Sequence, residues 1–311
     1  MRLVRHLRPG ERPFGSPVVT LGNFDGFHLG HRAIIERTVE RARSAASSSV
    51  VFTFTPHPIA VLKPGHAPAM ITSLARRLLL LRRHGVDGVV VRRFTREFAR
   101  LLPEDFVRQV LIDSLGVRAV VVGYNVNFGR DRTGTPALLA ELGARLGFDV
   151  EIVPPVVRDG VQVSSSLVRK RIAEGDVEGA ADLLGRPHAL LGKVRVGDRR
   201  GATIGFPTAN VYPRGGMLPP DGVYAVRVGL DGEAPLRPGV ANLGTNPTFG
   251  VKRRRLETHL FDHHGELYGR AIEVTFQKRL RGEEKFPSLD ALVRQIRTDA
   301  GIARRLLDAA P

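Results

Sequence analysis

Two histidines, separated by a leucine and a glycine, stand between a strand-like stretch and a helix-like stretch. His28 and His31 follow the apolar run at 18–21, and an amphipathic run continues from them to Ala42. The N–H groups in the first turn of a helix have no partner within the helix and bind anions. Imidazole N–H groups can hydrogen-bond phosphate oxygens, and Gly30 lets a phosphate approach the backbone. The spacing predicts a polyphosphate site; a glycine turn with two surface histidines is the simpler alternative.

A second group of anion-binding side chains begins another predicted helix, over residues 167–173. Ser165 and Ser166 precede this helix, and Arg169 stands in its first turn. Serine is a favoured N-cap residue, so capping alone is the alternative explanation. Hydroxyls, helix N–H groups and a guanidinium together suit phosphate. We therefore expect this group to hold the same triphosphate as the two histidines, from the other side.

Apolar runs alternate with helical patterns through the first half of the chain. The expected strands cover residues 50–54, 89–91, 119–122 and 150–153, and the expected helices cover residues 74–84, 104–115 and 137–146. This alternation predicts a parallel sheet with helices on both faces. The loops after the strands, which include 56–58 and 123–130, would meet at the carboxyl edge of the sheet, where such sheets bind ligands. The stretch 56–58 alone would indicate only a rigid loop.

The pattern changes after Arg186, where strands follow one another with glycine turns between them. The expected strands cover residues 189–196, 223–228, 256–261 and 271–278, and an amphipathic helix covers 289–307. Strands without intervening helices indicate an antiparallel sheet or a small closed barrel. We therefore predict an α/β chain, with a doubly wound parallel sheet in domain 1–186 and an antiparallel β-barrel with a C-terminal helix in domain 187–311.

A glycine-rich loop precedes two oxygen-bearing side chains in this second half. Its glycines, Gly197, Gly201 and Gly205, would let the loop close over a nucleotide. The Thr208 hydroxyl and the Asn210 amide carry oxygen atoms, which are the ligands that Mg²⁺ prefers. Both groups can also bind phosphate oxygens. A lone glycine loop is usually only a turn, so the prediction depends on the residues that follow it.

The composition limits the class of protein. The 311-residue chain is 42% hydrophobic, has no cysteine and carries a formal net charge of +16. The absence of cysteine excludes disulfides, thiolate metal sites and a cysteine nucleophile. The sequence contains no membrane-spanning run and no apolar export core at its N-terminus, so we expect a cytoplasmic protein with no membrane partner. The excess charge is nearly all arginine and is spread along the chain, which favours a solvated surface over nucleic-acid binding. The oligomeric state stays open.

Five stretches of the first half resemble the adenylyltransferase module of prokaryotic bifunctional riboflavin kinase/FAD synthetases, within the HxGH nucleotidylyltransferase superfamily. They are residues 22–31, 53–58, 123–129, 164–169 and 184–187. That module joins AMP from ATP to FMN, giving FAD and pyrophosphate. The resemblance implies catalytic roles for His28, His31 and Arg169, and ATP contacts by Gly22, Phe24, Asp25, Gly30, Asn125, Ser165 and Ser166. It also implies that Phe54, Pro56, His57 and Pro58 lie near the flavin.

The second half is similar to the flavokinase module of the same family. The stretch 205–210 matches its Mg²⁺-ATP motif, which implies nucleotide contacts by Gly197, Gly201, Gly205, Pro207, Thr208 and Asn210, with Thr208 and Asn210 as metal ligands. A ribityl hydroxyl is a poor nucleophile, and Glu257 is the base that the resemblance implies. We place Glu257 on the core side of its strand, away from the basic run at 252–255; an exposed strand glutamate is the alternative. Arg281 and Glu284 match the flavin-side segment.

We therefore predict a bifunctional transferase that phosphorylates riboflavin to FMN and adenylylates FMN to FAD. Mg²⁺ would accompany ATP, and riboflavin, FMN and FAD would be substrates and products. Three other interpretations stay open. The chain could be an adenylyltransferase for another phosphate substrate with a passive barrel, a basic nucleic-acid-binding protein, or a flavin carrier that never consumes ATP.

Overall fold

The computed structural model describes residues 1–196, 201, 204–231, 236–245, 254–263 and 265–309. The chain forms two compact units. The first holds Met1–Pro68 and Leu74–Ser164, and the second holds Ala69–Ser73 and Ser165–Pro311. None of the helices in these ranges combines the length and the apolar run that a membrane crossing requires.

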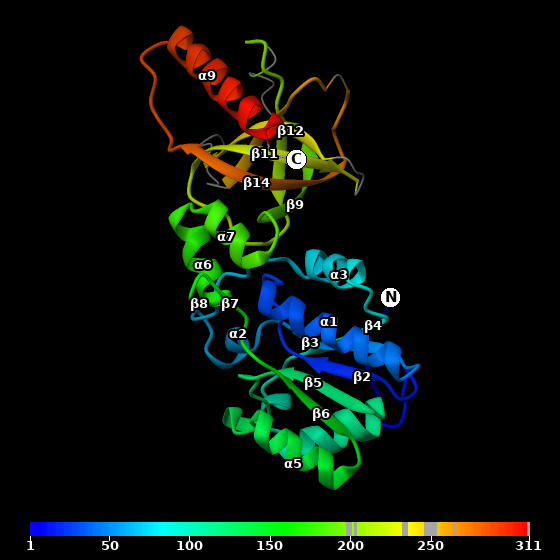
Figure 1. Ribbon diagram of the computed structural model, residues 1–311. Helices are drawn as coiled ribbons and strands as arrows, with labels where there is room; N and C mark the ends of the chain where they lie inside the picture. Colours follow the sequence, from blue (N-terminus) through cyan, green and yellow to red (C-terminus); the bar gives the residue numbers. More distant parts are fainter. Residues whose placement is uncertain (197–200, 202–203, 232–235, 246–253, 264, 310–311) are drawn as a thin grey trace. The chain divides into compact units, whose positions relative to one another are not determined.

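The first unit contains a six-stranded parallel sheet, in the order β1-β4-β3-β2-β5-β6 (Figure 1). The strands are β1 (Arg2–Val4), β2 (Val18–Leu21), β3 (Ser49–Thr55), β4 (Gly88–Arg93), β5 (Ala119–Gly123) and β6 (Asp149–Val153). The predicted parallel sheet is confirmed, with β1 as an edge strand that we did not anticipate. Strand β1 has only three residues, which is too short for an apolar pattern to indicate a strand.

Helices cover both faces of this sheet, because successive strand residues point to opposite sides. Val18, Val51, Val89 and Val121 pack toward α1 (Leu29–Ser44) and α3 (Leu74–Arg83). Val19, Val50, Val90 and Val120 pack toward η2 (Val107–Leu115) and α5 (Pro136–Leu146). The remaining elements are α2 (Pro58–Leu62), η1 (Phe98–Arg100), α4 (Pro103–Phe106), η3 (Arg130–Arg132), β7 (Val157–Arg158) and β8 (Val161–Gln162). The doubly wound arrangement is thus confirmed.

The helix predicted over 104–115 differs in type. It starts as α4, continues as the π-helix η2 and ends at Gly116, whose φ is 63°. Within it, Val107, Leu111 and Leu115 are fully buried at a spacing of four residues. The amphipathic pattern therefore marked the buried face correctly, although it could not distinguish the wider π turn from an α turn.

The second unit is a closed antiparallel barrel flanked by helices (Figure 1). Its strand order is β10-β13-β12-β11-β14-β9. The elements are α6 (Ser165–Glu174), α7 (Val177–Leu184), β9 (Ala189–Arg195), β10 (Ala209–Pro213), β11 (Gly222–Leu230), β12 (Arg237–Thr245), β13 (Arg254–Leu260), β14 (Ala271–Arg281) and α9 (Leu289–Asp308). The predicted barrel and C-terminal helix are confirmed. We did not anticipate β10 and β12, because Asn210, Pro238 and Gly239 disfavour strands in isolation.

The strands of the barrel are buried on their inner face and, in part, on their outer face. Tyr224, Leu256 and Phe276 belong to the interior cluster. On the outer surface, Ala303 and Leu307 of α9 pack against side chains of β11 and β12. Strands β11 and β12 therefore carry apolar residues on both faces, which a strand with one solvated face would not.

A short segment from the first half of the sequence belongs to the second unit. Ile71 is 0% exposed there, and its carbonyl accepts a hydrogen bond from the Met217 N–H at 3.4 Å. The Arg169 Nε donates to the carbonyl of Ala69 at 2.8 Å. Because Ala69–Ser73 lies in the second unit between two stretches of the first, the chain passes between the units three times.

Candidate active sites

Three loops of the first unit that carry predicted site residues follow neighbouring strands. Strands β3, β2 and β5 are adjacent in the sheet, and all three are parallel. Their carboxyl ends therefore meet at one edge, which brings the loops after Leu21, Thr55 and Gly123 to the same side. This is the convergence that the order of elements predicted.

His28 is fixed by the start of α1. It is the N-cap residue, and its Nδ1 accepts a hydrogen bond from the His31 N–H at 3.3 Å. Because Nδ1 is the acceptor, the neutral ring carries its proton on Nε2, where it is a donor. The two imidazoles stack with their centroids 3.7 Å apart and an interplanar angle of 18°. The sequence placed both histidines correctly at a helix start.

Close packing around these rings explains the glycines. A β carbon at Gly30 would lie 3.2 Å from the His28 ring, and one at Gly22 would lie 3.3 Å from the Phe24 ring. The Phe24 and His31 rings meet edge to face at 5.3 Å. Asp25 is buried in the same loop. Gly22, Phe24, Asp25 and Gly30 thus shape the loop that holds the histidines, and their contacts with ATP stay predictions.

The other two loops present different surfaces. Phe54 joins an aromatic cluster, with its ring 5.4 Å from Phe52 and 5.5 Å from Phe94. His57 caps α2, since its Nδ1 accepts from the Ile59 N–H at 3.2 Å; Pro56 and Pro58 flank it. Asn125 is exposed. The flavin role of residues 54–58 and the nucleotide role of Asn125 stay predictions.

The predicted second phosphate clamp lies at the start of α6, in the second unit. Ser165 begins this helix, Ser166 is exposed, and Arg169 is held by the Ala69 carbonyl described above. The helix starts two residues earlier than the predicted range. That Ser165, Ser166 and Arg169 meet the same triphosphate as the histidines stays a prediction.

The second unit contains a cavity of about 950 Å³ on the outer surface of the barrel. One wall is formed by outward-facing residues of β10, β12 and β13, and the opposite wall by α9 and the segment before it. Most of the predicted kinase residues line it: Gly201, Thr208, Asn210, Glu257, Arg281 and Glu284. Gly205 and Pro207 are exposed beside it, and Gly197 lies outside the described residues.

A row of three polar side chains crosses the barrel wall of this cavity. Strand pairing sets Asn210 opposite Glu257, and Glu257 opposite Asn242. All three line the cavity. The carboxylate and two amides therefore lie side by side on one surface, which suits a reaction among phosphate oxygens, a metal and a hydroxyl.

The predicted orientation of Glu257 is wrong. Its neighbours Leu256 and Thr258 point into the barrel, whereas Glu257 lies on the outer face and lines the cavity. It is also not remote from the basic run, because its Oε1 accepts from the Arg255 Nε at 2.9 Å and from the second guanidinium nitrogen at 2.5 Å. Burial lowers the pKa of Arg255, but the hydrogen bonds that Arg255 makes with Glu257 and Tyr212 outweigh it and raise the pKa overall.

The basic run is accordingly not a solvated surface throughout. Arg254 donates from its Nε to Asp221 at 2.6 Å, and Arg255 has a side chain that is only 12% exposed. Residues 252 and 253 lie outside the described part of the chain. The expectation of a solvated arginine surface is therefore wrong at these two positions.

Arg281 joins the two sides of the cavity. Its Nε donates to Asp299 of α9 at 3.0 Å, and another of its nitrogens lies 2.9 Å from the same carboxylate. Gln295 donates to the other Asp299 oxygen at 2.9 Å, and the Arg281 guanidinium lies 5.5 Å from the Phe286 ring. This network holds the segment before α9 in place, so Arg281 shapes the cavity wall. Its flavin contact, like that of Glu284, stays a prediction.

Asp299→Asn is expected to destabilise the second unit and to weaken the riboflavin binding that the sequence predicts for it. Asp299 is buried, and breaking a buried ion pair costs about 3–5 kcal/mol. Chemical denaturation should show the lower free energy of unfolding, and kinase kinetics should show a raised KM for riboflavin. Asp308→Asn, on the exposed end of the same helix, is the control. An unchanged KM would contradict the role of this network in shaping the cavity.

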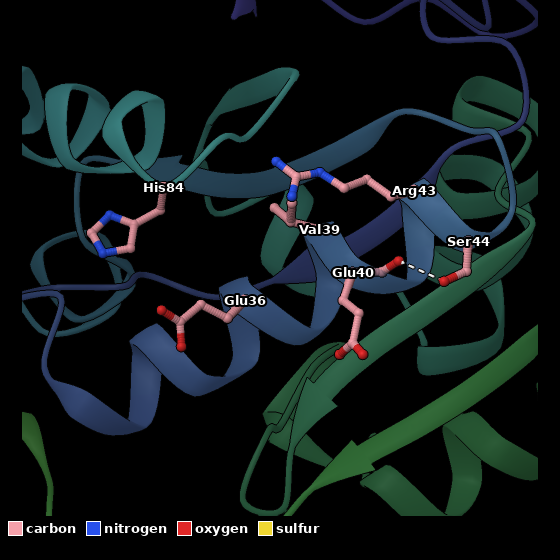
Figure 2. A pocket seen from close by; sticks show the side chains of 6 residues that line it. All are labelled: Glu36, Val39, Glu40, Arg43, Ser44 and His84. Carbon is pink, nitrogen blue, oxygen red and sulfur yellow. Dashed lines mark hydrogen bonds between the residues drawn. The ribbon is translucent and has the colours of Figure 1, made fainter.

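Another depression, in the first unit, contains none of the predicted site residues. It measures about 330 Å³ and lies between α1 and the residue after α3, lined by Glu36, Val39, Glu40, Arg43, Ser44 and His84 (Figure 2). Its carboxylates are already paired along α1, since Glu36 accepts from Arg32 at 2.7 Å and Glu40 from Arg37 at 2.8 Å.

Both halves match known families. Residues 13–167 match the FAD synthetase family, and residues 184–307 match the riboflavin kinase family. A bifunctional riboflavin kinase/FMN adenylyltransferase of Escherichia coli strain K12 is 42% identical over 305 residues, which cover 98% of this chain and 97% of the relative. This chain belongs to the bifunctional riboflavin kinase/FMN adenylyltransferase family.

Other members of the bifunctional family are similar over almost their whole length. The relative from Pseudomonas fluorescens is 42% identical over 315 residues, covering 100% of this chain and 99% of its own. The relative from Bacillus subtilis strain 168 is 38% identical over 288 residues, covering 91% and 90%. A crystal structure described as a macrolide-efflux protein from Streptococcus pneumoniae matches with a TM-score of 0.88 at 31% identity, over 98% of this chain and 99% of that chain.

The oxygen donors in the cavity of this family member fit a magnesium ion. Asn210 is 6% exposed, and within the described residues its Oδ1 accepts no hydrogen bond. Thr208 and Glu257 line the same cavity. Mg²⁺ prefers oxygen ligands and usually keeps waters and substrate phosphates among them. The described ranges contain no group of three or more acidic, histidine or cysteine side chains that could hold a metal.

Three residues that line the cavity were not among the predicted site residues. Arg255 stands two positions before Glu257, and the period of a strand places such a pair on one face. That spacing was visible but was interpreted as part of a charge run. Asn242 begins a stretch, 242–249, that also resembles the flavokinase module, but the sequence assigns it no role, because cross-strand register brings it to the cavity. Asp299 reaches the cavity through the docking of α9, which the sequence does not display.

Proposed function

We propose that residues 187–311 transfer the γ-phosphoryl group of ATP to riboflavin, and that residues 1–186 transfer AMP from a second ATP to the FMN. The products are FMN with ADP in the first reaction and FAD with pyrophosphate in the second. The observation that carries the proposal is the barrel cavity, in which one wall offers amide and carboxylate groups and the other an apolar helix face. Membership of the bifunctional family supports both activities.

Each wall of the cavity suits a different part of the substrates of the kinase reaction. Leu289, Leu292 and Ile296 of α9 face the cavity and suit the apolar rings of a flavin. Asn210, Asn242 and Glu257 lie on the barrel wall and suit the phosphates and the reacting hydroxyl. Glu257 accepts the proton of the terminal ribityl hydroxyl as its oxygen attacks the γ-phosphorus, and the bond from that phosphorus to the bridging oxygen of ADP breaks.

Arg255 fixes the base. Two hydrogen bonds from Arg255 reach Oε1 of Glu257, which orients the carboxylate so that Oε2 would meet the substrate hydroxyl. Thr208 and Asn210 would hold Mg²⁺, which neutralises phosphate charge when bound. Gly201, Gly205 and Pro207 would contact the nucleotide, together with Gly197.

Adenylylation needs alignment more than acid–base chemistry. The FMN phosphate is already anionic, so its oxygen attacks the α-phosphorus of ATP without a general base, and pyrophosphate leaves. His28 donates from Nε2, and His31 assists, as charge builds on the transferring group. Ser165, Ser166 and Arg169 hold the triphosphate. The remaining ATP contacts are Gly22, Phe24, Asp25, Gly30 and Asn125, and the flavin contacts of this half are Phe54, Pro56, His57 and Pro58.

One incubation tests the proposal against its alternatives. The full chain is mixed with riboflavin, ATP and Mg²⁺, and the flavins are resolved by chromatography. We expect FMN and then FAD. Bound riboflavin without product would indicate a flavin carrier, and FAD from added FMN alone would indicate a passive barrel. No flavin chemistry, with tight salt-dependent binding of duplex or RNA, would indicate a nucleic-acid-binding protein.

Removing the metal should stop both reactions. With excess EDTA we expect neither FMN nor FAD, because the phosphates would lack their counter-charge, and added Mg²⁺ should restore both. Isothermal titration of the Asn210→Ala variant with Mg²⁺-ADP should show weaker binding than the unaltered chain. Full FMN formation in EDTA would contradict the metal assignment.

We further propose that the enzyme works in the cytoplasm on small molecules, without a nucleic-acid or membrane partner. Two arginines that could have belonged to a basic surface are instead paired at the cavity, Arg255 with Glu257 and Arg281 with Asp299, which supports this proposal.

A further inference from the structure

Arg77 is a buried cation that neither proposed reaction uses. It lies on α3 and is only 5% exposed. Burial lowers its pKa, and the negative charge of Asp25 opposes that effect. A buried charge is costly unless hydrogen bonds and an opposite charge compensate it. The contacts that compensate the buried charge of Arg77 therefore indicate why it lies there.

The guanidinium of Arg77 is aimed at the loop between β2 and α1. One of its terminal nitrogens donates to the Asn23 carbonyl, and its charge interacts with Asp25. Its Nε is buried and, among the described residues, makes no hydrogen bond. The contacts of the Arg77 guanidinium are therefore with the loop that precedes His28, and not with its own helix.

That loop is strained. Phe24 and Phe27 have φ values of 49° and 48°, in the left-handed region that bulky side chains rarely adopt. Such a conformation persists only where its surroundings impose it. Both rings are buried, and the Phe27 N–H donates to the Phe24 carbonyl at 3.1 Å. Arg77 contacts this loop from another element, at the Asn23 carbonyl and at Asp25.

The strained residues lie next to the first of the two histidines. His28 follows Phe27 without an intervening residue, caps α1 and is 6% exposed. Its ring is confined by the stacked ring of His31 at 3.7 Å and by the backbone at Gly30. A shift of the loop at Asn23 and Asp25 would therefore move the His28 ring rather than be absorbed before it.

We propose that Arg77 is a positioning residue for adenylyl transfer, which holds the loop from Asn23 to Phe27 in the strained form that presents His28 to the transferring phosphoryl group. The proposal rests on the proposed role of His28. It separates Arg77 from Arg82 and Arg83, which are exposed at the end of the same helix.

The test compares Arg77→Met and Arg77→Lys with the control Arg82→Met, all in the full chain. Misplacing a catalytic group by about 1 Å costs on the order of 10²-fold in rate, so Arg77→Met should lose about that factor in kcat for FAD formation from FMN. The KM values for ATP and FMN should stay close to those of the unaltered chain. Arg77→Lys keeps the charge beside Asp25 and should lose less. Riboflavin phosphorylation should be unchanged in all three variants.

A spectroscopic readout separates positioning from stability. ¹⁵N NMR of the histidine rings should show an acceptor Nδ1 and a protonated Nε2 at His28 in the unaltered chain and in Arg82→Met, and a changed pattern in both Arg77 variants. If Arg77→Met does not fold, Arg77→Lys decides. A folded Arg77 variant with unaltered kcat and unaltered His28 signals would overturn the proposal. If the unaltered chain forms no FAD from FMN, the proposed function fails instead.

Discussion

Glu257→Gln is expected to lower the rate of FMN formation by about 10²–10⁴-fold, the usual contribution of a general base. Glutamine has nearly the same shape and can still accept the Arg255 hydrogen bonds, so the cavity should keep its form. The loss would therefore report the missing proton acceptor. Chromatographic assays with riboflavin measure the loss, and assays with added FMN should show unchanged FAD formation.

Glu266→Gln is the matched control, because Glu266 is exposed and lies outside the cavity lining. It should leave both rates unchanged. A Glu257→Gln variant that phosphorylates riboflavin at the original rate would exclude Glu257 as the base, while the location of the kinase site in the cavity would stand on its other residues.

His28→Ala should affect the other reaction. We expect FAD formation to fall by about 10²–10³-fold while FMN accumulates from riboflavin. The variant lacks the Nε2 donor that we place against the developing charge. It also lacks the N-cap of α1, which costs about 0.5–2 kcal/mol of stability. Chromatography of the products and thermal unfolding measure the two effects separately.

His28→Asn distinguishes them. Asparagine is a good N-cap, so this variant should regain the stability and still lack the activity. His66→Ala, at an exposed position of the first unit, should change neither. Rapid FAD formation by the stable His28→Asn variant would be incompatible with a catalytic imidazole.

The sequence predicted the fold of the first unit almost completely, because its strands are continuous β-branched runs and its helices are amphipathic. Such runs are typical of parallel strands, which are buried on both faces. Because parallel strands share the direction of the chain, the loops after β2, β3 and β5 meet at one edge. Among the strands of the main sheet, the exception is the edge strand β1. Its three residues pair with Gly88, Val89 and Val90, and only this long-range pairing defines it.

The site in the second unit was harder to predict. Alternation along β13 separates Glu257 from Leu256 and Thr258, but it does not say which set faces the barrel interior. We expected the acid on the core side, and the core contains Leu256 instead. The outer face is also covered, because α9 packs over neighbouring strands and leaves a cavity, so an outward position did not mean a solvated one.

Ion pairs limited the prediction in the same way. The run that ends in Arg255 has the composition of a solvated surface. The partners of Arg254 and Arg255 are Asp221 on another segment and Glu257 on the same strand. Of these, only the pair on one strand has a spacing that the sequence displays.

The segment Ala69–Ser73 bears on any attempt to separate the two activities. A fragment that starts at Ser165 or at Pro187 would omit Ile71, whose side chain is fully enclosed in the intact chain. Losing the burial of one such side chain costs about 1.5–3 kcal/mol. Limited proteolysis after Ser164 should therefore leave two pieces that stay associated, and a gene split at that point should yield a barrel that needs its missing peptide added back.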